Sequence, residues 1–454
     1  MIVEKIKTEG LAHLSYFVGS GPDAAVIDPR RDIEVYVRLA DAHGMRIRHV
    51  LETHRNEDLV SGAPALSRET GARIWHGPNP AEPVRYAETA REGDSFELGD
   101  ARLEVLETPG HTDDSLSFVL FDRDLGEGAV GVLTGDALFI GDVGRTDFYP
   151  DRPREVAGML HDSLWKIMGL GDQALVYPAH GAGSVCGSGM ADREFSSLGH
   201  ERRNNPMLQI ADREAFIDAK VSENHYQPPY FRLMERLNSE GGPAMQRFIM
   251  PPRMPVDALT DGAEAQLVDV RSITAFAGAH LPGSLAIPHD MLAAFAGWLL
   301  DPEREIRLLA EDGRQAEESV RTLGRIGFDG VSCYAAGMVG GATQGVAFRT
   351  MPMVDTETVR RRLGDDMPNW QLLDVRSIDE FEGGHIDDAI HVYVGQLPEE
   401  LDRLDRDRAV TVYCGSGKRA AIAASVLRAN GFGEVDVYLG SIAAWKADGL
   451  RLAA

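Results

Sequence analysis

The sequence predicts an α/β protein with one large N-terminal domain followed by two smaller α/β domains that are copies of each other. Its 454 residues suffice for roughly three domains of about 150 residues. Strand-like runs alternate with helix-like runs, as where Ala409–Tyr413 precedes a helical stretch near Ala420, and this alternation favours parallel sheets flanked by helices. The tetrapeptide Asp-Val-Arg-Ser at 269–272 returns at 374–377. A repeat at this spacing indicates duplicated domains.

Proline and glycine mark the expected domain boundaries. They cluster at 228–229, 241–243 and 251–252, and a Met-Pro-Met segment lies at 351–353. Such clusters are typical of linkers. The predicted domains are residues 1–245, 253–348 and 353–454.

Composition and charge indicate a soluble protein of a reducing compartment. Hydrophobic residues make up 43% and charged residues 26% of the chain. No apolar run approaches the roughly 18 residues that a membrane helix requires, and the first residues lack the apolar stretch of a signal peptide. Three cysteines supply no disulfide framework and suit the cytoplasm. A net charge of −25 disfavours nucleic acid and anionic membranes as partners. A homo-oligomer is compatible with these features and is left open.

Cys414 opens a turn between an expected strand and an expected helix. Residues 414–420 read Cys-Gly-Ser-Gly-Lys-Arg-Ala. Backbone N–H groups at a helix N-terminus surround a cysteine in this position, and Lys418 and Arg419 lie nearby, so the local field favours the thiolate. The same donors can hold a second, anionic sulfur atom. The segment therefore predicts sulfur transfer through a cysteine persulfide, with these three residues as the catalytic group.

This loop and the motifs before it resemble the rhodanese family, whose active-site loop has six residues with Cys first and Arg last. Residues 373–377 and 384–386 are similar to the N-terminal signature of that family. The earlier copy has the same signature, but Ala310 stands in the position of Cys414 and Gln315 in that of Arg419. Without sulfur there is no nucleophile. We expect a catalytically silent rhodanese fold at 253–348 and an active one at 353–454.

Metal-binding side chains follow four expected strands of the N-terminal domain. The strands at 47–52, 103–108, 130–134 and 175–179 precede, in turn, His54, His111, Asp136 and His180. Functional side chains commonly lie on loops at one edge of a rigid scaffold. The order therefore predicts a metal site at the strand ends.

This pattern resembles the metallo-β-lactamase superfamily, which implies an αββα sandwich. The first motif of that family is usually His-x-His-x-Asp-His and helps to hold two metals, whereas residues 54–59 read His-Arg-Asn-Glu-Asp-Leu. Leu59 cannot bind a metal, so a normal second site should not form. The surviving set is His54, His111 and Asp136. It matches the facial triad of non-haem iron enzymes, which leaves positions open for dioxygen and substrate. Zinc with three protein ligands is the alternative.

The same three-ligand set is used by the persulfide dioxygenases of this superfamily. Residues 141–148, Gly-Asp-Val-Gly-Arg-Thr-Asp-Phe, and the pair at 205–206, Asn-Pro, are similar to that subfamily. The glycine-rich turn at 180–189 resembles bacterial fusions of a persulfide dioxygenase with two rhodanese domains. The resemblance covers essentially the whole chain and implies one Fe(II) per chain.

Further site residues are expected around the metal. Arg145 and Arg203 are candidates for binding an anionic thiol carrier. Tyr177 and His180 are expected to border the substrate pocket and to orient the ligands. Cys186, on the glycine-rich turn, is the candidate thiol that takes sulfur from a bound persulfide.

The two chemistries combine into one expected function, which is sulfide detoxification. The metal site oxidises a low-molecular-weight thiol persulfide with O₂ to sulfite, and Cys414 exchanges sulfane sulfur among persulfide, sulfite and thiosulfate. One alternative is a mononuclear zinc thioester hydrolase of the glyoxalase II kind, which the loss of second-metal ligands disfavours. Another is a non-catalytic sulfur carrier that uses Cys414 alone, which the intact metal-ligand set disfavours.

Overall fold

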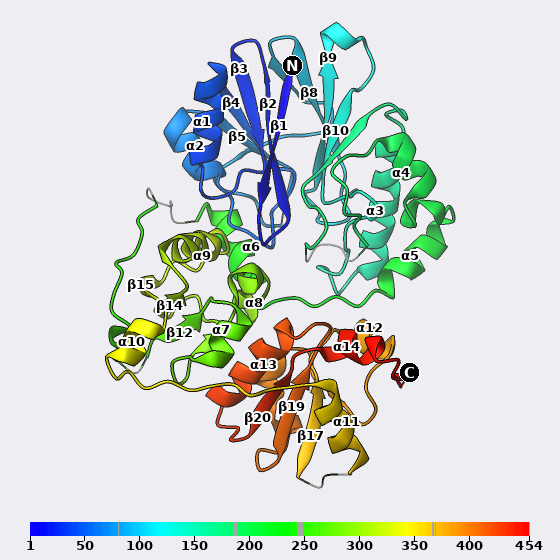
Figure 1. The fold of residues 1–454 in the computed structure, drawn as a ribbon. Helices are drawn as coiled ribbons and strands as arrows, with labels where there is room; N and C mark the ends of the chain where they lie inside the picture. Colours follow the sequence, from blue (N-terminus) through cyan, green and yellow to red (C-terminus); the bar gives the residue numbers. More distant parts are fainter. Residues whose placement is uncertain are drawn as a thin grey trace. The chain divides into compact units, whose positions relative to one another are not determined.

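The structure is a computed structural model that describes residues 1–79, 81–184, 189–242, 248–262, 264–365, 367 and 369–453. Its contacts divide the chain into two compact units, residues 1–248 with 325–327 and residues 249–324 with 328–454 (Figure 1). The finer division at 1–245, 253–348 and 353–454 stays a prediction. Within the described ranges, no helix is both long and apolar enough to cross a bilayer.

The first unit is a sandwich of two β-sheets with helices on its outer faces (Figure 1). The strand order of the first sheet is β1-β2-β3-β4-β5-β6, and that of the second is β11-β10-β9-β8-β7. The strands are β1 Ile2–Thr8, β2 His13–Ser20, β3 Asp23–Ile27, β4 Arg46–Leu51, β5 Arg73–His76, β6 Glu88–Thr89, β7 Ser95–Leu98, β8 Ala101–Glu107, β9 Leu116–Asp122, β10 Gly131–Gly135 and β11 Leu175–Pro178.

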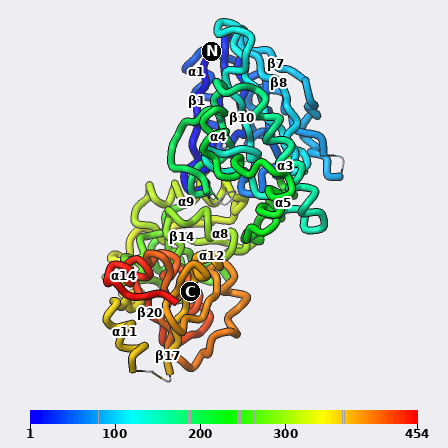
Figure 2. The backbone as a smooth tube through the Cα atoms, turned by 90° about the vertical axis from the view of Figure 1, so that its right-hand side faces the viewer, coloured from blue at the N-terminus to red at the C-terminus, as the bar shows by residue number. Residues whose placement is uncertain are grey.

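Helices cover both faces of this sandwich. Their bounds are α1 Glu34–His43, α2 Ala63–Thr70, α3 Pro153–Met168, α4 Leu198–Asn204, α5 Arg213–Val221 and α6 Phe231–Glu240. Helices α1 and α2 pack on the first sheet, and α3 and α5 pack on the second. Figure 2 views the unit from the side of α3, α4 and α5. The expected αββα sandwich is therefore confirmed.

Three apolar layers hold these elements together. Between the sheets lie the buried side chains of Tyr16, Phe96 and Phe118, among others. Leu160 and Leu164 of α3 pack against the outer face of the second sheet, and a third layer fills the space under α1 and α2. Each sheet is thus covered on both faces, so the loops at its edge are the parts free to carry polar groups.

The second unit contains two small parallel sheets, one for each repeat. Their orders are β13-β12-β14-β15 and β16-β20-β19-β17-β18. The strands are β12 Gln266–Asp269, β13 Leu285–Ala286, β14 Ile306–Ala310, β15 Val331–Ala336, β16 Met353–Val354, β17 Trp370–Asp374, β18 Ile390–His391, β19 Ala409–Tyr413 and β20 Val435–Tyr438. The helices are α7 Ile273–Gly278, α8 Leu292–Leu299, α9 Gly313–Arg325, α10 Val339–Thr343, α11 Thr356–Gly364, α12 Ile378–Glu382, α13 Lys418–Ala429 and α14 Ser441–Ala447.

Helix α13 is buried along most of its length because both repeats pack against it. It contacts β19 and β20 of its own repeat and β13 of the other. The hydroxyl of Ser425 accepts a hydrogen bond from the backbone N–H of Ala286 at 2.9 Å. Four alanines on this helix, Ala420, Ala421, Ala423 and Ala424, are buried. Small side chains allow neighbouring backbones to approach this closely.

The repeated signature builds the fold of each copy. Arg376 forms charge-assisted hydrogen bonds with Asp374 and donates to the carbonyl of Gly384. In the earlier copy, Arg271 pairs with Asp269 in the same way and donates to the carbonyl of Ala279. These groups are buried in both copies. The Asp-Val-Arg-Ser motif therefore has a structural role, and it is present also in the copy that has no cysteine at the loop.

Breaking this buried pair should destabilise the second unit. We expect Asp374→Ala to lower the free energy of unfolding by about 3–5 kcal/mol, because it leaves the Arg376 guanidinium buried without its partner. Urea unfolding followed by circular dichroism measures this change. Asp402→Ala, at a surface position, serves as the control, and a loss below about 1 kcal/mol for Asp374→Ala would contradict the structural role.

Candidate metal centre and sulfur-transfer loop

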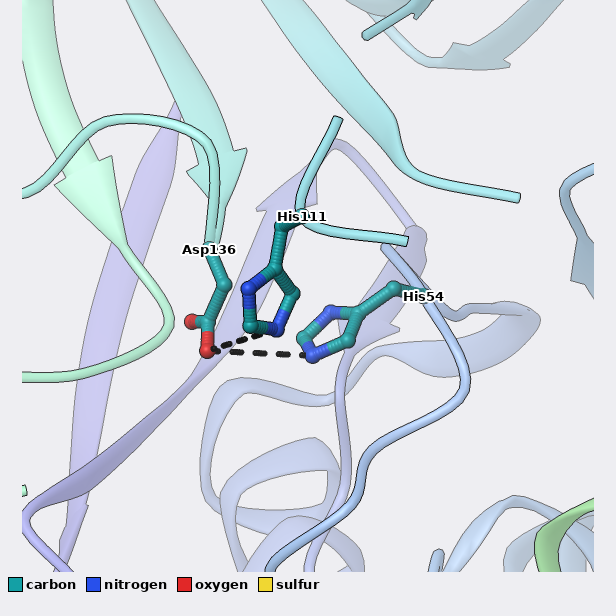
Figure 3. A group of neighbouring side chains, drawn as sticks. All are labelled: His54, His111 and Asp136. Carbon is teal, nitrogen blue, oxygen red and sulfur yellow. Dashed lines mark ion pairs between the residues drawn. The ribbon is translucent and has the colours of Figure 1, made fainter. Parts of the chain in front are cut away.

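Three buried side chains converge at the strand ends of the first unit. His54 lies just beyond β4, His111 beyond β8, and Asp136 directly after β10. Their ligand atoms all lie within 4.8 Å of one another. Asp136 Oδ2 is 3.5 Å from His111 Nε2 and 3.8 Å from His54 Nε2 (Figure 3). Separate strands therefore bring together the three side chains that the sequence singled out.

The opposite ring nitrogens show that these histidines are oriented as metal ligands. His111 Nδ1 lies 3.0 Å from the backbone oxygen of Arg145, and since a carbonyl only accepts, Nδ1 carries the hydrogen. His54 Nδ1 is 2.9 Å from the hydroxyl of Thr53, which donates to Asp28 at 2.8 Å. Both Nε2 lone pairs thus face the common space, as in metal sites whose outer partners fix the tautomer.

Electrostatics at this point favour a bound cation. Burial lowers the pKa of His54, which favours the neutral ring that a metal requires. At His111, burial is outweighed by the carboxylates of Glu57 and Asp136, and the pKa is raised. His111 Nε2 has no hydrogen-bond partner among the described residues. The donor set, its burial and this unpaired nitrogen fit a metal ion held by two histidines and one carboxylate.

His180 joins the carboxylates of Asp136 and Asp58. Its Nδ1 is 2.8 Å from Asp136 Oδ1, and its Nε2 is 2.9 Å from Asp58 Oδ2. Burial acts to raise the pKa of Asp136, but the charge and hydrogen bond of His180 outweigh burial and hold it far below the ordinary value. The neighbouring Leu59 is buried and apolar. The imidazole ring of His180 therefore fixes the carboxylate of Asp136, whose Oδ2 faces His54 and His111.

Aromatic side chains form one wall beside the metal ligands. The ring of Phe148 meets that of His111 edge to face, with centroids 5.2 Å apart. Phe231, from α6, lies 6.2 Å from Phe148. Apolar walls of this kind exclude water and lower the local dielectric constant, which strengthens the interactions of a bound ion.

The remaining residues predicted near the metal lie in different settings. Arg145 is buried, and its guanidinium donates two hydrogen bonds of 2.6 Å to Asp147. The side chain of Arg203 is 69% exposed and pairs with Asp172. The half-buried ring of Tyr177 packs against Tyr16. Cys186 lies outside the described residues. The substrate-binding assignments of these residues stay predictions.

The second unit places Cys414 directly after β19, buried at the start of α13. The backbone N–H of Gly417 donates to Cys414 Sγ at 3.1 Å, and the hydroxyl of Ser441 lies 4.0 Å from the same sulfur. The N–H donor stands where a negative sulfur needs one. The loop therefore has the arrangement expected for an anionic sulfur at the head of a helix.

Both cations of this loop are paired. Arg419 makes two hydrogen bonds, of 2.6 and 2.7 Å, with Glu380. Burial acts to raise the pKa of Glu380, but Arg419 outweighs it and lowers the pKa to about 2. Lys418 forms an ion pair with Asp290, which belongs to the other repeat. Both positive charges of the loop are therefore held in place by neighbouring carboxylates.

The corresponding loop of the first repeat lacks both the cysteine and the arginine. In β14, Leu309 pairs with Asp269 as Tyr413 pairs with Asp374 in β19. The next residue, Ala310, therefore occupies the position of Cys414. Gln315, in the position of Arg419, accepts a hydrogen bond from the backbone N–H of Glu311 at 2.8 Å and closes the loop on itself. No nucleophile stands at the head of α9.

Comparison with known families agrees with this architecture. The family model of the metallo-beta-lactamase superfamily matches residues 8–180. The family model of the rhodanese-like domain matches residues 255–343 and 355–448. The chain belongs to the metallo-beta-lactamase superfamily and carries two rhodanese-like domains.

Relatives of this superfamily member include two named enzymes. The mitochondrial persulfide dioxygenase ETHE1 of Bos taurus is 28% identical over 42% of this chain and 69% of its own length. The hydroxyacylglutathione hydrolase GloC of Haemophilus influenzae is 27% identical over 41% of this chain and 87% of its own length. A metallo-beta-lactamase structure from Staphylococcus aureus subsp. aureus COL is 29% identical with a TM-score of 0.68, covering 74% of this chain and 99% of that one. The predicted resemblance to persulfide dioxygenase–rhodanese fusions is confirmed.

Sequence reasoning missed three residues that surround the metal ligands. Thr53 and Asp28 hold the ring of His54, and Glu57 faces the ligand nitrogens. Thr53 and Glu57 lie within the first motif or beside it, so proximity to His54 was a signal. Asp28 comes from the end of β3, and only the parallel pairing of β3 with β4 brings it near.

Removing the hydroxyl that holds His54 should weaken metal binding. We expect Thr53→Val, which keeps the side-chain shape, to reduce affinity for a divalent metal by about 10–100-fold, because the ring loses the acceptor that fixes its tautomer. Competitive titration with a metal-sensitive chelator measures this affinity. Thr70→Val, at the end of α2, is the matched control. Equal affinity in both variants would show that Thr53 does not orient the ligand.

Proposed function

We propose that the chain oxidises a low-molecular-weight thiol persulfide with O₂ to sulfite at one iron ion and transfers sulfane sulfur through Cys414. The observation that carries this proposal is the buried set of His54, His111 and Asp136, whose ligand atoms lie within 4.8 Å of one another. The similarity to the persulfide dioxygenase of Bos taurus supports the same reaction class.

Iron is the metal that suits this reaction best. Two histidines and one carboxylate on one face leave positions open for dioxygen and for a substrate. Zinc supports no redox change, whereas oxidation of a persulfide to sulfite removes electrons from sulfur. A bound ferrous ion would therefore supply the redox chemistry that the chain's own side chains lack.

The protein contributes orientation and exclusion of water around that ion. Thr53 and the backbone oxygen of Arg145 fix the ligand rings of His54 and His111. Phe148 covers one side of His111. Arg203, exposed on α4, is our candidate contact for the anionic carrier, and its pairing with Asp172 would have to open.

At the second site the proposed step is sulfur transfer. The Cys414 thiolate attacks the sulfane sulfur of thiosulfate, a new S–S bond forms, and the old S–S bond breaks with its electron pair leaving on sulfite. The terminal sulfur of the cysteine persulfide is then anionic, and the N–H of Gly417 stands beside Sγ to donate to such charge. An acceptor thiolate takes this sulfur, which regenerates the Cys414 thiolate and produces a persulfide.

The second candidate function is a zinc thioester hydrolase. The similarity to hydroxyacylglutathione hydrolase GloC favours it. Metal analysis together with oxygen uptake on glutathione persulfide, compared with hydrolysis of S-lactoylglutathione, separates the two. One iron per chain with oxygen uptake supports the dioxygenase, whereas zinc with thioester hydrolysis and no oxygen uptake supports the hydrolase.

Loss of one imidazole ligand should abolish metal binding and oxidation together. We expect His111→Ala to reduce bound iron from about one per chain to trace levels and to stop oxygen uptake on a persulfide, because the ion loses one of its two imidazole ligands. Elemental analysis and an oxygen electrode provide the two readouts. His161→Ala, on α3, is the control. Full iron content in His111→Ala, or two tightly bound zinc ions in the parent, would overturn the assignment.

Loss of the cysteine should separate the two activities. Cys414→Ser should abolish transfer of sulfur from thiosulfate to a thiol, because a hydroxyl is a far weaker nucleophile at neutral pH. Oxygen uptake on a supplied persulfide should stay largely intact. Ala310→Cys in the Cys414→Ser background should not restore transfer, since Gln315 lacks the charge of Arg419. Equal loss of both activities in Cys414→Ser would indicate one shared active site.

A further inference from the structure

Glu57 aims its carboxylate at the two ligand nitrogens of the metal centre. Its Oε2 lies 3.5 Å from His111 Nε2 and 3.8 Å from His54 Nε2, and the side chain is 2% exposed. Within the described part of the chain, Oε2 has no hydrogen-bond partner. Burying an ionised carboxylate without a partner is costly. Together with Asp136 Oδ2, which faces the same two imidazole nitrogens, Glu57 completes a donor set that suits a cation.

The carboxylate of Asp136 provides an internal standard for this geometry. Asp136 Oδ2 lies at the same two distances, 3.5 Å from His111 Nε2 and 3.8 Å from His54 Nε2. Metal bonds of about 2.0–2.2 Å place neighbouring ligand atoms of one ion roughly 3–4 Å apart. Glu57 therefore meets the nitrogen pair as closely as the predicted carboxylate ligand does.

The backbone around Glu57 is held in place by α6. Asn238 donates from Nδ2 to the carbonyl oxygens of Asn56 and Leu59, at 2.7 and 2.8 Å. These two acceptors flank Glu57 in the sequence, so the loop cannot move far without breaking buried hydrogen bonds. Asn56 stands in the position of the second motif histidine, and its buried Oδ1 has no hydrogen-bond partner among the described residues. The adjacent carboxylate of Glu57 is the group that lies beside both ligand nitrogens.

We propose that Glu57 is a fourth metal ligand, which takes over from the missing second histidine and creates a centre of two histidines and two carboxylates. This inference rests on the metal centre proposed above but not on the reaction that it performs. Two carboxylates would neutralise the charge of a divalent ion. Glu57 would therefore supply both a ligand and a compensating charge.

Cobalt(II) binding to the full-length protein tests the assignment without relying on activity. Cobalt replaces iron in such donor sets, and its visible absorption reports the number and type of ligands. Metal-free parent, Glu57→Ala and Glu57→Gln are titrated with Co²⁺. Glu82→Ala is the matched control, because Glu82 is an exposed carboxylate that pairs with Arg55 beside the same loop. Near-UV circular dichroism of the metal-free proteins verifies folding.

We expect Glu57→Ala to raise the dissociation constant for Co²⁺ at least about tenfold and to shift the visible spectrum, while Glu82→Ala matches the parent. A folded Glu57→Ala with the dissociation constant and spectrum of the parent would overturn the proposal. If Glu57→Ala does not fold, Glu57→Gln decides by the same two readouts. A parent that binds Co²⁺ through Glu57 but consumes no oxygen with a persulfide would overturn the proposed function and leave this ligand assignment standing.

Discussion

The Asp136 carboxylate is the group on which the chemistry of the first unit depends. One oxygen faces the Nε2 atoms of His54 and His111, and the other accepts from His180. His180 also bonds Asp58, so one imidazole ring joins the two carboxylates. Asp136 is thus held by His180 through one oxygen while the other faces the candidate ligand nitrogens.

The packing of the sandwich stabilises this cluster of buried ionisable groups. Burying several ionisable groups within a few ångströms is unfavourable unless each has a partner. The apolar layers on both sides of each sheet hold the strand ends in place, and outer contacts such as Thr53 with Asp28 fix the rings. His111 Nε2 and Glu57 Oε2 have no hydrogen-bond partner among the described residues and lie 3.5 Å apart, which points to the place where a cation would complete the network.

In the second unit, the residues that stabilise the fold also differ from those expected to carry out sulfur transfer. Both repeats keep the buried Asp–Arg pair, since either fold loses stability without it. Only one keeps Cys414, Arg419 and Glu380 together. In the first repeat Ala310 stands in the position of Cys414, Ala275 in that of Glu380 and Gln315 in that of Arg419, so all three groups are absent together from that loop. The first repeat packs β13 against α13, and its Asp290 pairs with Lys418.

The sequence by itself determined the α/β class and the repeat, and it predicted the sulfur-transfer loop and the three converging candidate ligands, because these depend on local patterns: strand-like runs, glycine-rich turns and side chains just past strand ends. It also indicated that Leu59 removes a second-metal ligand, since no fold can make a leucine bind a metal. Only the tertiary structure decided what surrounds the candidate ligands. Asp28 reaches Thr53 through strand pairing, and His180 comes from β11 to meet Asp58. Glu57 faces the nitrogens in a loop whose flanking carbonyls are held by Asn238 of α6. Such contacts join residues that are up to about 180 positions apart in the chain, and their geometry follows from packing, which no local pattern encodes.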